Sequence, residues 1–276
     1  MPRAPFRSQP LRGLFVTLLY AVAVAAAVRA ARGHAQRPAL REPAVYLAGT
    51  ALALHAWWLA AIVHTHGGFA LTLADSASLL GWLIGAGGLV ALCVPGFRGV
   101  AVILLACALL LAAGTGSLPQ IHEYAAPDWP LTGHMLLAMS AAGLFALAAV
   151  LAVVLIVQDA GLRSRRPADW LALLPPIESL ERALFAITVT GFAALSVAIL
   201  AGFLFVTNLF AQHLAHKTVL ALSAWLVFAV LLAGHWRFGW RGRRAASYTL
   251  AGFGILVLAY FGSKFVLEVL LGRSWG

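Results

Sequence analysis

Apolar residues occur along this chain in long blocks that short polar segments separate. Most blocks have about the 20 residues that an α-helix needs to cross roughly 30 Å of hydrocarbon. The blocks show no strict alternation of apolar and polar residues, which excludes a membrane β-barrel. The pattern therefore predicts about eight transmembrane helices, near residues 14–31, 44–63, 74–94, 99–114, 134–157, 183–207, 217–234 and 248–271.

Composition supports this interpretation. Hydrophobic residues make up 62% of the 276 residues and charged residues 10%, whereas soluble domains carry about 25% charged residues. A water-soluble fold is therefore excluded, and we predict an all-α, polytopic membrane protein with one transmembrane domain over residues 1–276. The longest connector, 158–182, has room for a short interfacial helix, which we expect to begin at Pro175-Pro176 because proline suits a first helical turn.

The net charge of +10 comes from short basic clusters between the apolar blocks, so anionic lipid is the expected partner and nucleic acid is not. The even-numbered loops carry only Lys217. Because cytoplasmic loops retain Lys and Arg, the odd loops are predicted to be cytoplasmic and both termini periplasmic, in a bacterial inner membrane. The odd loops hold Arg29, Arg32, Arg37, Arg41, Arg98, Arg163, Arg165, Arg166, Arg182, Arg237, Arg241, Arg243 and Arg244.

The first apolar block has some features of a signal peptide. Arg3, Arg7 and Arg12 precede it, and the small residues 25–27 lie near its end. Cleavage there would leave the arginines between 29 and 41 on the outer side, against the charge rule. We therefore expect the first helix to stay uncleaved.

The nine histidines are unevenly distributed in this topology. Neutral imidazole is a common haem-iron ligand, and two histidines from different helices can hold an iron axially. The alternative is that these histidines are only tolerated at a membrane interface, since no metal-ligand spacing such as H-E-x-x-H is present. The outer loops and outer helix ends carry His64, His66, His122, His134, His213 and His216.

Polar residues inside the predicted spans allow further alternatives. His55 lies in mid-membrane, where it either serves function or hydrogen-bonds a neighbouring helix. Lys264 and Glu268 are one turn apart in the last span, either as a local ion pair near the interface or as part of a transport path. Gly81-x-x-x-Gly85 and the following Gly87-Gly88 predict close helix packing.

Several segments, taken together, resemble the CcsA/HemX-like cytochrome c assembly family, and among its subgroups the small YpjD-type inner membrane proteins. The resemblance implies eight helices, haem handling at the outer face, and delivery of haem to apocytochrome c. His55 matches a common family position, and His134 the first outer haem ligand. The segments are His134–Met139 with the long helix that ends at Gln158, Leu174–Arg182, Ala224–Ala229, Gly239–Ala245 and Tyr260–Gly262.

The sequence departs from the family pattern at the outer face. Residues 207–224 contain no tryptophan where haem-handling members carry a Trp-rich segment, and the second outer histidine would fall near Leu271. We therefore expect a non-enzymatic member, with any haem held by His134 and by either His213 or His216. The alternatives are a transporter or transporter accessory that uses His55 and the Lys264–Glu268 pair, and a structural partner of other membrane proteins.

Overall fold

The computed structural model describes residues 9–32, 38–65, 73–115, 129–164, 169–205 and 212–262, and within these ranges all regular structure is helical. The predicted all-α class is confirmed. A 3₁₀-helix, η1 (Asp169–Leu173), precedes α6, and a π-helical turn, η2 (Leu258–Gly262), follows α8. The α-helices are α1 (Gln9–Arg32), α2 (Pro38–Thr65), α3 (Leu73–Cys93), α4 (Arg98–Thr115), α5 (Trp129–Leu162), α6 (Ile177–Phe205), α7 (Gln212–Phe238) and α8 (Gly242–Val257).

Each helix overlaps one of the predicted spans. Among the described residues, seven helices are long and apolar enough to cross a membrane, and α4 is an apolar helix of slightly shorter length. At 1.5 Å per residue, even its 18 residues extend over about 27 Å. The chain is therefore a polytopic helical membrane protein.

The connector before α6 differs from the prediction. Its short helix is η1, which lies before the prolines, and the helix that follows Pro175-Pro176 is α6 itself, beginning at Ile177. The Pro176 carbonyl accepts hydrogen bonds from the backbone N–H groups of Ser179 (2.9 Å) and Leu180 (3.1 Å), which closes the first turn of α6. The prediction of a separate interfacial helix beginning at the prolines was wrong. The first turns of α6 contain Glu178, Glu181 and Arg182, and these charged residues hide in the sequence that the helix continues into the apolar span.

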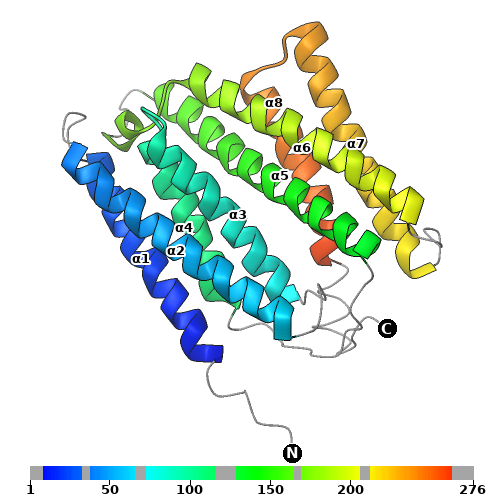
Figure 1. Ribbon diagram of the computed structural model, residues 1–276. Coiled ribbons are helices and arrows are strands. Elements are labelled where there is room, and N and C mark those ends of the chain that lie inside the picture. Colours follow the sequence, from blue (N-terminus) through cyan, green and yellow to red (C-terminus); the bar gives the residue numbers. More distant parts are fainter. Residues whose placement is uncertain are drawn as a thin grey trace, which may run out of the picture. The chain divides into compact units, whose positions relative to one another are not determined.

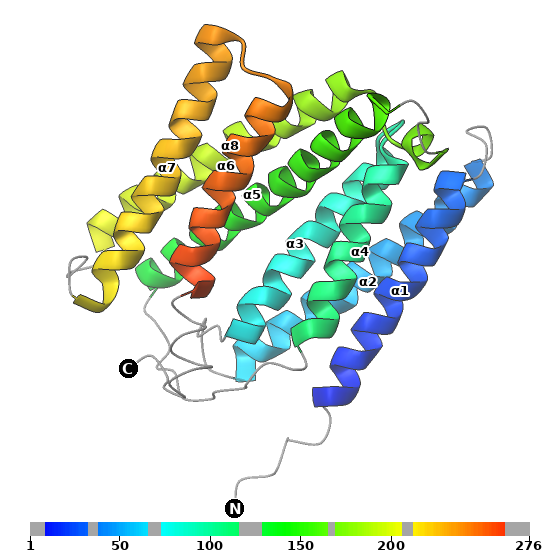
Figure 2. The same cartoon turned by 180° about the vertical axis from the view of Figure 1, so that it is seen from behind.

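The helices group into two compact units, Met1–His122 with α1 to α4 and Glu123–Gly276 with α5 to α8. In the first unit taken by itself, α1 and α3 begin, and α2 and α4 end, at one common end (Figures 1 and 2). In the second unit by itself, α5 and α7 begin, and α6 and η2 end, at one common end (Figures 1 and 2). Each unit is thus an up-and-down set of helices.

Glycines on one face of α3 allow the close packing of the first unit. A Cβ added at Gly81 would lie 3.0 Å from the Cβ of Leu111, and one at Gly88 would lie 2.9 Å from the Cγ of Leu105, both on α4. A Cβ at Gly85 would lie 2.9 Å from the hydroxyl oxygen of Tyr20 on α1. The predicted packing role of these glycines is confirmed.

Two stacked phenylalanines form the centre of the second unit. Phe145 of α5 and Phe228 of α7 are fully buried, and their ring centroids lie 3.7 Å apart. A Cβ at Gly252 of α8 would lie 2.7 Å from the Cζ of Phe228. Three helices therefore meet at this ring pair, and α8 can approach it only because residue 252 has no side chain.

Candidate functional site

His134 lies near the start of α5 and is held by a backbone carbonyl of α6. Its Nδ1 is 2.9 Å from the carbonyl oxygen of Ala198. Because a carbonyl oxygen only accepts, Nδ1 carries the proton and donates it in this bond. In the neutral ring Nε2 then holds a lone pair, and no residue in the described ranges hydrogen-bonds to it.

The face of α6 that receives this imidazole is made of small residues. A Cβ added at Gly202 would lie 3.1 Å from the Cε1 of His134. Ala198 and Gly202 are four residues apart and therefore share a helix face. The fixed Nδ1–H bond and the close α6 surface together define the tautomer and the position of the ring, as outer-shell partners do for histidines that ligate metals.

The other two predicted outer ligands lie on α7. His216 is exposed, and α7 begins at the same end of the second unit as α5 (Figures 1 and 2). His213 belongs to the first turn of α7, and its side chain lies outside the described residues. The helix runs through both positions, so they share a face as expected, and ligation by either one stays a prediction.

His55 lies in the first unit and is fully buried. Its Nε2 is 2.8 Å from the Ser78 Oγ on α3, and its Nδ1 is 3.1 Å from the Tyr20 hydroxyl on α1. Either hydroxyl can donate or accept, so the network is satisfied in both neutral tautomers. Both ring nitrogens thus join helices, and iron ligation by His55 would require one of these bonds to break.

Sequence reasoning did not single out Tyr20 or Ser78. The only signal for either is a hydroxyl within an otherwise apolar block, and that signal does not say which helix the hydroxyl faces. Asp75 and Ser76, in the first turns of the same helix α3, are also buried. The buried polar side chains of α3 therefore lie in its first half.

A second histidine of the second unit is bonded in the same way at the opposite helix ends. His235, near the end of α7, donates its Nδ1–H to the Trp240 carbonyl at 2.9 Å. Its ring stacks on Phe185 of α6 at 3.6 Å between centroids. The Phe185 ring covers one face of the His235 imidazole. His235 thus has the same kind of Nδ1–H bond as His134 but is packed between helices.

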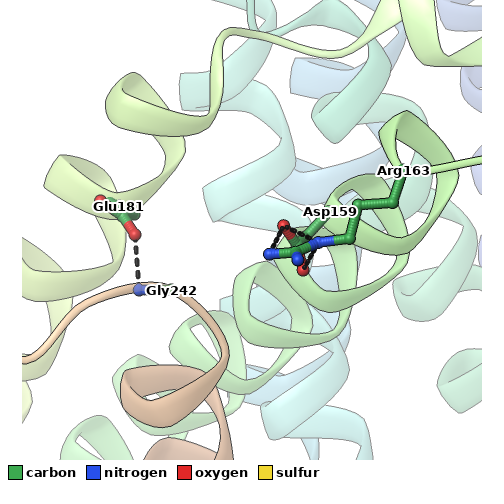
Figure 3. Close-up of polar contacts among 4 residues, drawn as sticks. All are labelled: Asp159, Arg163, Glu181 and Gly242. Atoms are coloured by element: carbon green, nitrogen blue, oxygen red, sulfur yellow. Dashed lines mark hydrogen bonds and ion pairs between the residues drawn. The ribbon is translucent and has the colours of Figure 1, made fainter.

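Acidic side chains at these helix ends have local partners, shown in Figure 3. The Glu181 carboxylate of α6 accepts a hydrogen bond from the Gly242 N–H at 2.6 Å, at the start of α8. Asp159 forms an ion pair with Arg163, one turn later on α5, at 3.1 Å. The first contact joins two helices, whereas the second lies within one helix.

Other residues raised by the sequence lie outside the described part of the chain. Within the described ranges, no group of three or more His, Cys, Asp or Glu residues could hold a metal ion. The Lys264–Glu268 pair of the transport alternative lies outside the described residues. The residues concerned are His34, His66, His122, Lys264 and Glu268, together with the side chain of His64.

The fold and these histidines define a polytopic helical membrane protein with a buried polar network in one unit and an oriented imidazole at a helix end of the other. A sequence model of the cytochrome c assembly protein family matches residues 50–271. Since that match extends over most of the chain, the protein belongs to the cytochrome c assembly protein family. The resemblance inferred from the sequence is confirmed.

Two relatives illustrate this membership. The chain is 43% identical over 97 residues to the inner membrane protein YpjD of Escherichia coli K12, an alignment of 35% of this chain and 37% of that protein. It is 33% identical over 132 residues to the cytochrome c biogenesis protein CcsA of a Synechococcus strain, an alignment of 42% of this chain and 38% of that protein. The chain thus spans less than half the length of either relative. No solved structure matches.

Proposed function

We propose that the protein handles haem as a cargo at the helix ends of the second unit where His134 lies, without catalysing a reaction on it. The observation that carries the proposal is the Nδ1–H bond from His134 to the Ala198 carbonyl at 2.9 Å, which directs the proton away from Nε2. An imidazole with a free Nε2 is a common axial ligand of haem iron. The family and the name of the CcsA relative supply the class of cargo.

The proposed arrangement suits transfer better than storage. The ring of His134 is fixed by its hydrogen bond, and the second ligand would be the exposed His216 or its neighbour His213. Residues 207–224 offer no tryptophan to stack on a porphyrin. A cargo without a tryptophan platform to stack on can leave readily, so apocytochrome c or another assembly protein is the natural recipient.

Haem content is the test of this proposal. We expect protein purified from cells supplied with a haem precursor to show a Soret band, and we expect His134→Ala to lower the haem per protein by about tenfold or more, the scale of losses at metal sites. Added imidazole should restore part of the band in the His134→Ala protein. His235→Ala is the matched control, because His235 makes the same type of Nδ1–H bond at the other end of the unit.

The proposal fails if the wild-type protein carries no haem, or if His134→Ala carries as much haem as His235→Ala. A His213→Ala/His216→Ala double variant addresses the second ligand. A shifted Soret maximum at unchanged haem content would support ligation from α7. An unchanged spectrum would show that neither His213 nor His216 ligates the iron.

We also propose that both termini face the periplasm. In support, the helix ends opposite to His134 in the second unit carry Arg163, Arg182 and Arg237, and cytoplasmic ends retain arginine. A reporter that is active only in the periplasm is expected to be active when fused after Gly276 and inactive when fused after Arg163. Activity of a strictly cytoplasmic reporter after Gly276 would reverse the proposed orientation.

A further inference from the structure

The turn between α7 and α8, residues 236–244, carries four arginines and no acidic residue. All of its arginines are exposed, and none forms an ion pair with a residue in the described ranges. The first turn of α8 contains no acidic residue. The Glu181 carboxylate reaches this turn and accepts the Gly242 N–H, so it offsets one of the four positive charges and leaves the turn with a net positive charge. The arginines of the turn are Arg237, Arg241, Arg243 and Arg244.

The backbone of this turn is rigidly defined. The Gly239 N–H donates to the His235 carbonyl at 3.0 Å, and the Trp240 N–H donates to the Gly234 carbonyl at 3.2 Å. The Gly239 bond to the carbonyl four residues earlier, with Gly239 at a φ of +66°, is an αL cap that ends α7. Gly242 has a φ of +58° and allows α8 to begin immediately afterwards.

Trp240 forms a platform at the centre of the turn. Its ring lies directly against the backbone of α7, because a Cβ added at Gly234 would overlap it. The Arg244 guanidinium carbon lies 3.8 Å from the ring centroid of Trp240, and the Tyr248 ring packs at 5.0 Å. Stacking uses the face of the planar guanidinium and leaves its N–H donors for a further ligand.

Two other aromatic residues of the turn are unusually exposed. Trp236 is 71% exposed and Phe238 is 74% exposed. They lie at the end of the apolar span His216–Phe238, which is where aromatic side chains enter the interfacial layer of a bilayer. The arginines that follow are therefore at the level of the lipid headgroups.

We propose that residues 236–244 form a binding site for an anionic phospholipid, with Arg241, Arg243 and Arg244 donating to its phosphate and with Trp236 and Phe238 packing beside its glycerol and upper acyl chains. Arginine matches phosphate oxygens with paired N–H donors, which favours it for this role. Four arginines around the single Glu181 carboxylate leave a net positive charge, which selects an anionic over a zwitterionic lipid. The exposed aromatic pair selects a lipid over free phosphate.

Other arginines at the same helix ends are different, which makes the site specific. Arg163 is paired with Asp159, and Arg182 donates to the Ser179 hydroxyl at 3.1 Å. They satisfy the charge rule for topology equally well, but their charges or donors already have local partners. They therefore provide matched controls for charge at this end of the second unit.

The test uses the full chain in detergent, equilibrated with equal amounts of phosphatidylglycerol and phosphatidylcholine, with bound lipid counted by native mass spectrometry. We expect wild type to retain phosphatidylglycerol preferentially. The Arg241→Gln/Arg243→Gln/Arg244→Gln protein should lose this preference by about tenfold or more, given the attraction of each arginine to anionic lipid. The Arg163→Gln/Arg182→Gln control should keep it.

Further arms separate the alternatives. Single Arg243→Gln and Trp236→Ser variants should each lower the preference in part, so a triple variant that fails to fold does not remove the test. Inorganic phosphate at millimolar concentration should not displace the lipid; displacement would overturn the assignment to a lipid. Equal retention of both lipids by wild type, or equal loss in the control, would overturn the site.

Discussion

Replacing His55 by leucine is expected to destabilise the first four-helix unit by about 2 kcal/mol, because the Tyr20 and Ser78 hydroxyls would be left buried without their partner. Both residues are fully buried and belong to different helices. This value is smaller than the summed cost of two buried hydroxyls without partners, because a chain unfolded within a membrane or micelle also finds polar partners. Reversible unfolding in mixed micelles, followed by tryptophan fluorescence, measures it.

The control for this prediction removes the orphaned groups together with the histidine. A His55→Leu/Tyr20→Phe/Ser78→Ala protein should be more stable than His55→Leu alone, since replacing all partners of a hydrogen bond costs less than removing one. Tyr20→Phe keeps the ring that packs edge-on against His55 at 5.7 Å. If the triple variant is as unstable as the single one, packing and not hydrogen bonding accounts for the role of His55.

The second large effect is expected at Gly252, where leucine should lower the stability of the second unit by about 3 kcal/mol, the upper end for overpacking a core. The new Cβ would lie 2.7 Å from Phe228. Phe228 cannot move away easily, because it is stacked on Phe145 at 3.7 Å. The midpoint of unfolding of the purified protein reports this loss.

Two further variants make this prediction specific. Gly254→Leu on the same helix should be nearly neutral, because no atom lies within 4 Å of a Cβ at that position. Gly252→Leu/Phe228→Ala should cost less than the sum of the two single variants, since the smaller residue gives the leucine room and the two sites are in contact. Equal effects of leucine at 252 and 254 would show that helix flexibility, not the ring pair, sets the cost.

The helices were predictable because the membrane imposes a length and a composition on each one. Their ends were less predictable where a helix continues into water. The span predicted at 134–157 is part of α5, Trp129–Leu162, and the span predicted at 183–207 belongs to α6, Ile177–Phe205. Hydropathy follows the apolar core of a helix, whereas backbone hydrogen bonds and proline define where the helix begins.

The partners of the candidate site were not predictable in the same way. His134 bonds a backbone carbonyl, and every residue of α6 has one, so no side chain marks Ala198 as the acceptor. A hydrogen bond to a neighbouring helix was one of the two roles considered for His55, but the choice of Tyr20 and Ser78 depends on how three helices rotate about their axes. The spacing of apolar residues within one helix does not reveal that rotation.

The division of the chain after His122 also affects its synthesis. A ribosome that adds about 5–20 residues per second needs roughly 6–25 seconds to complete the first unit before α5 appears. The bonds of His55 involve only α1, α2 and α3, which precede α5 in the chain, so they can close before the second unit is complete. The order of helices along the chain thus allows the buried polar network to mature during translation, ahead of the unit that carries His134.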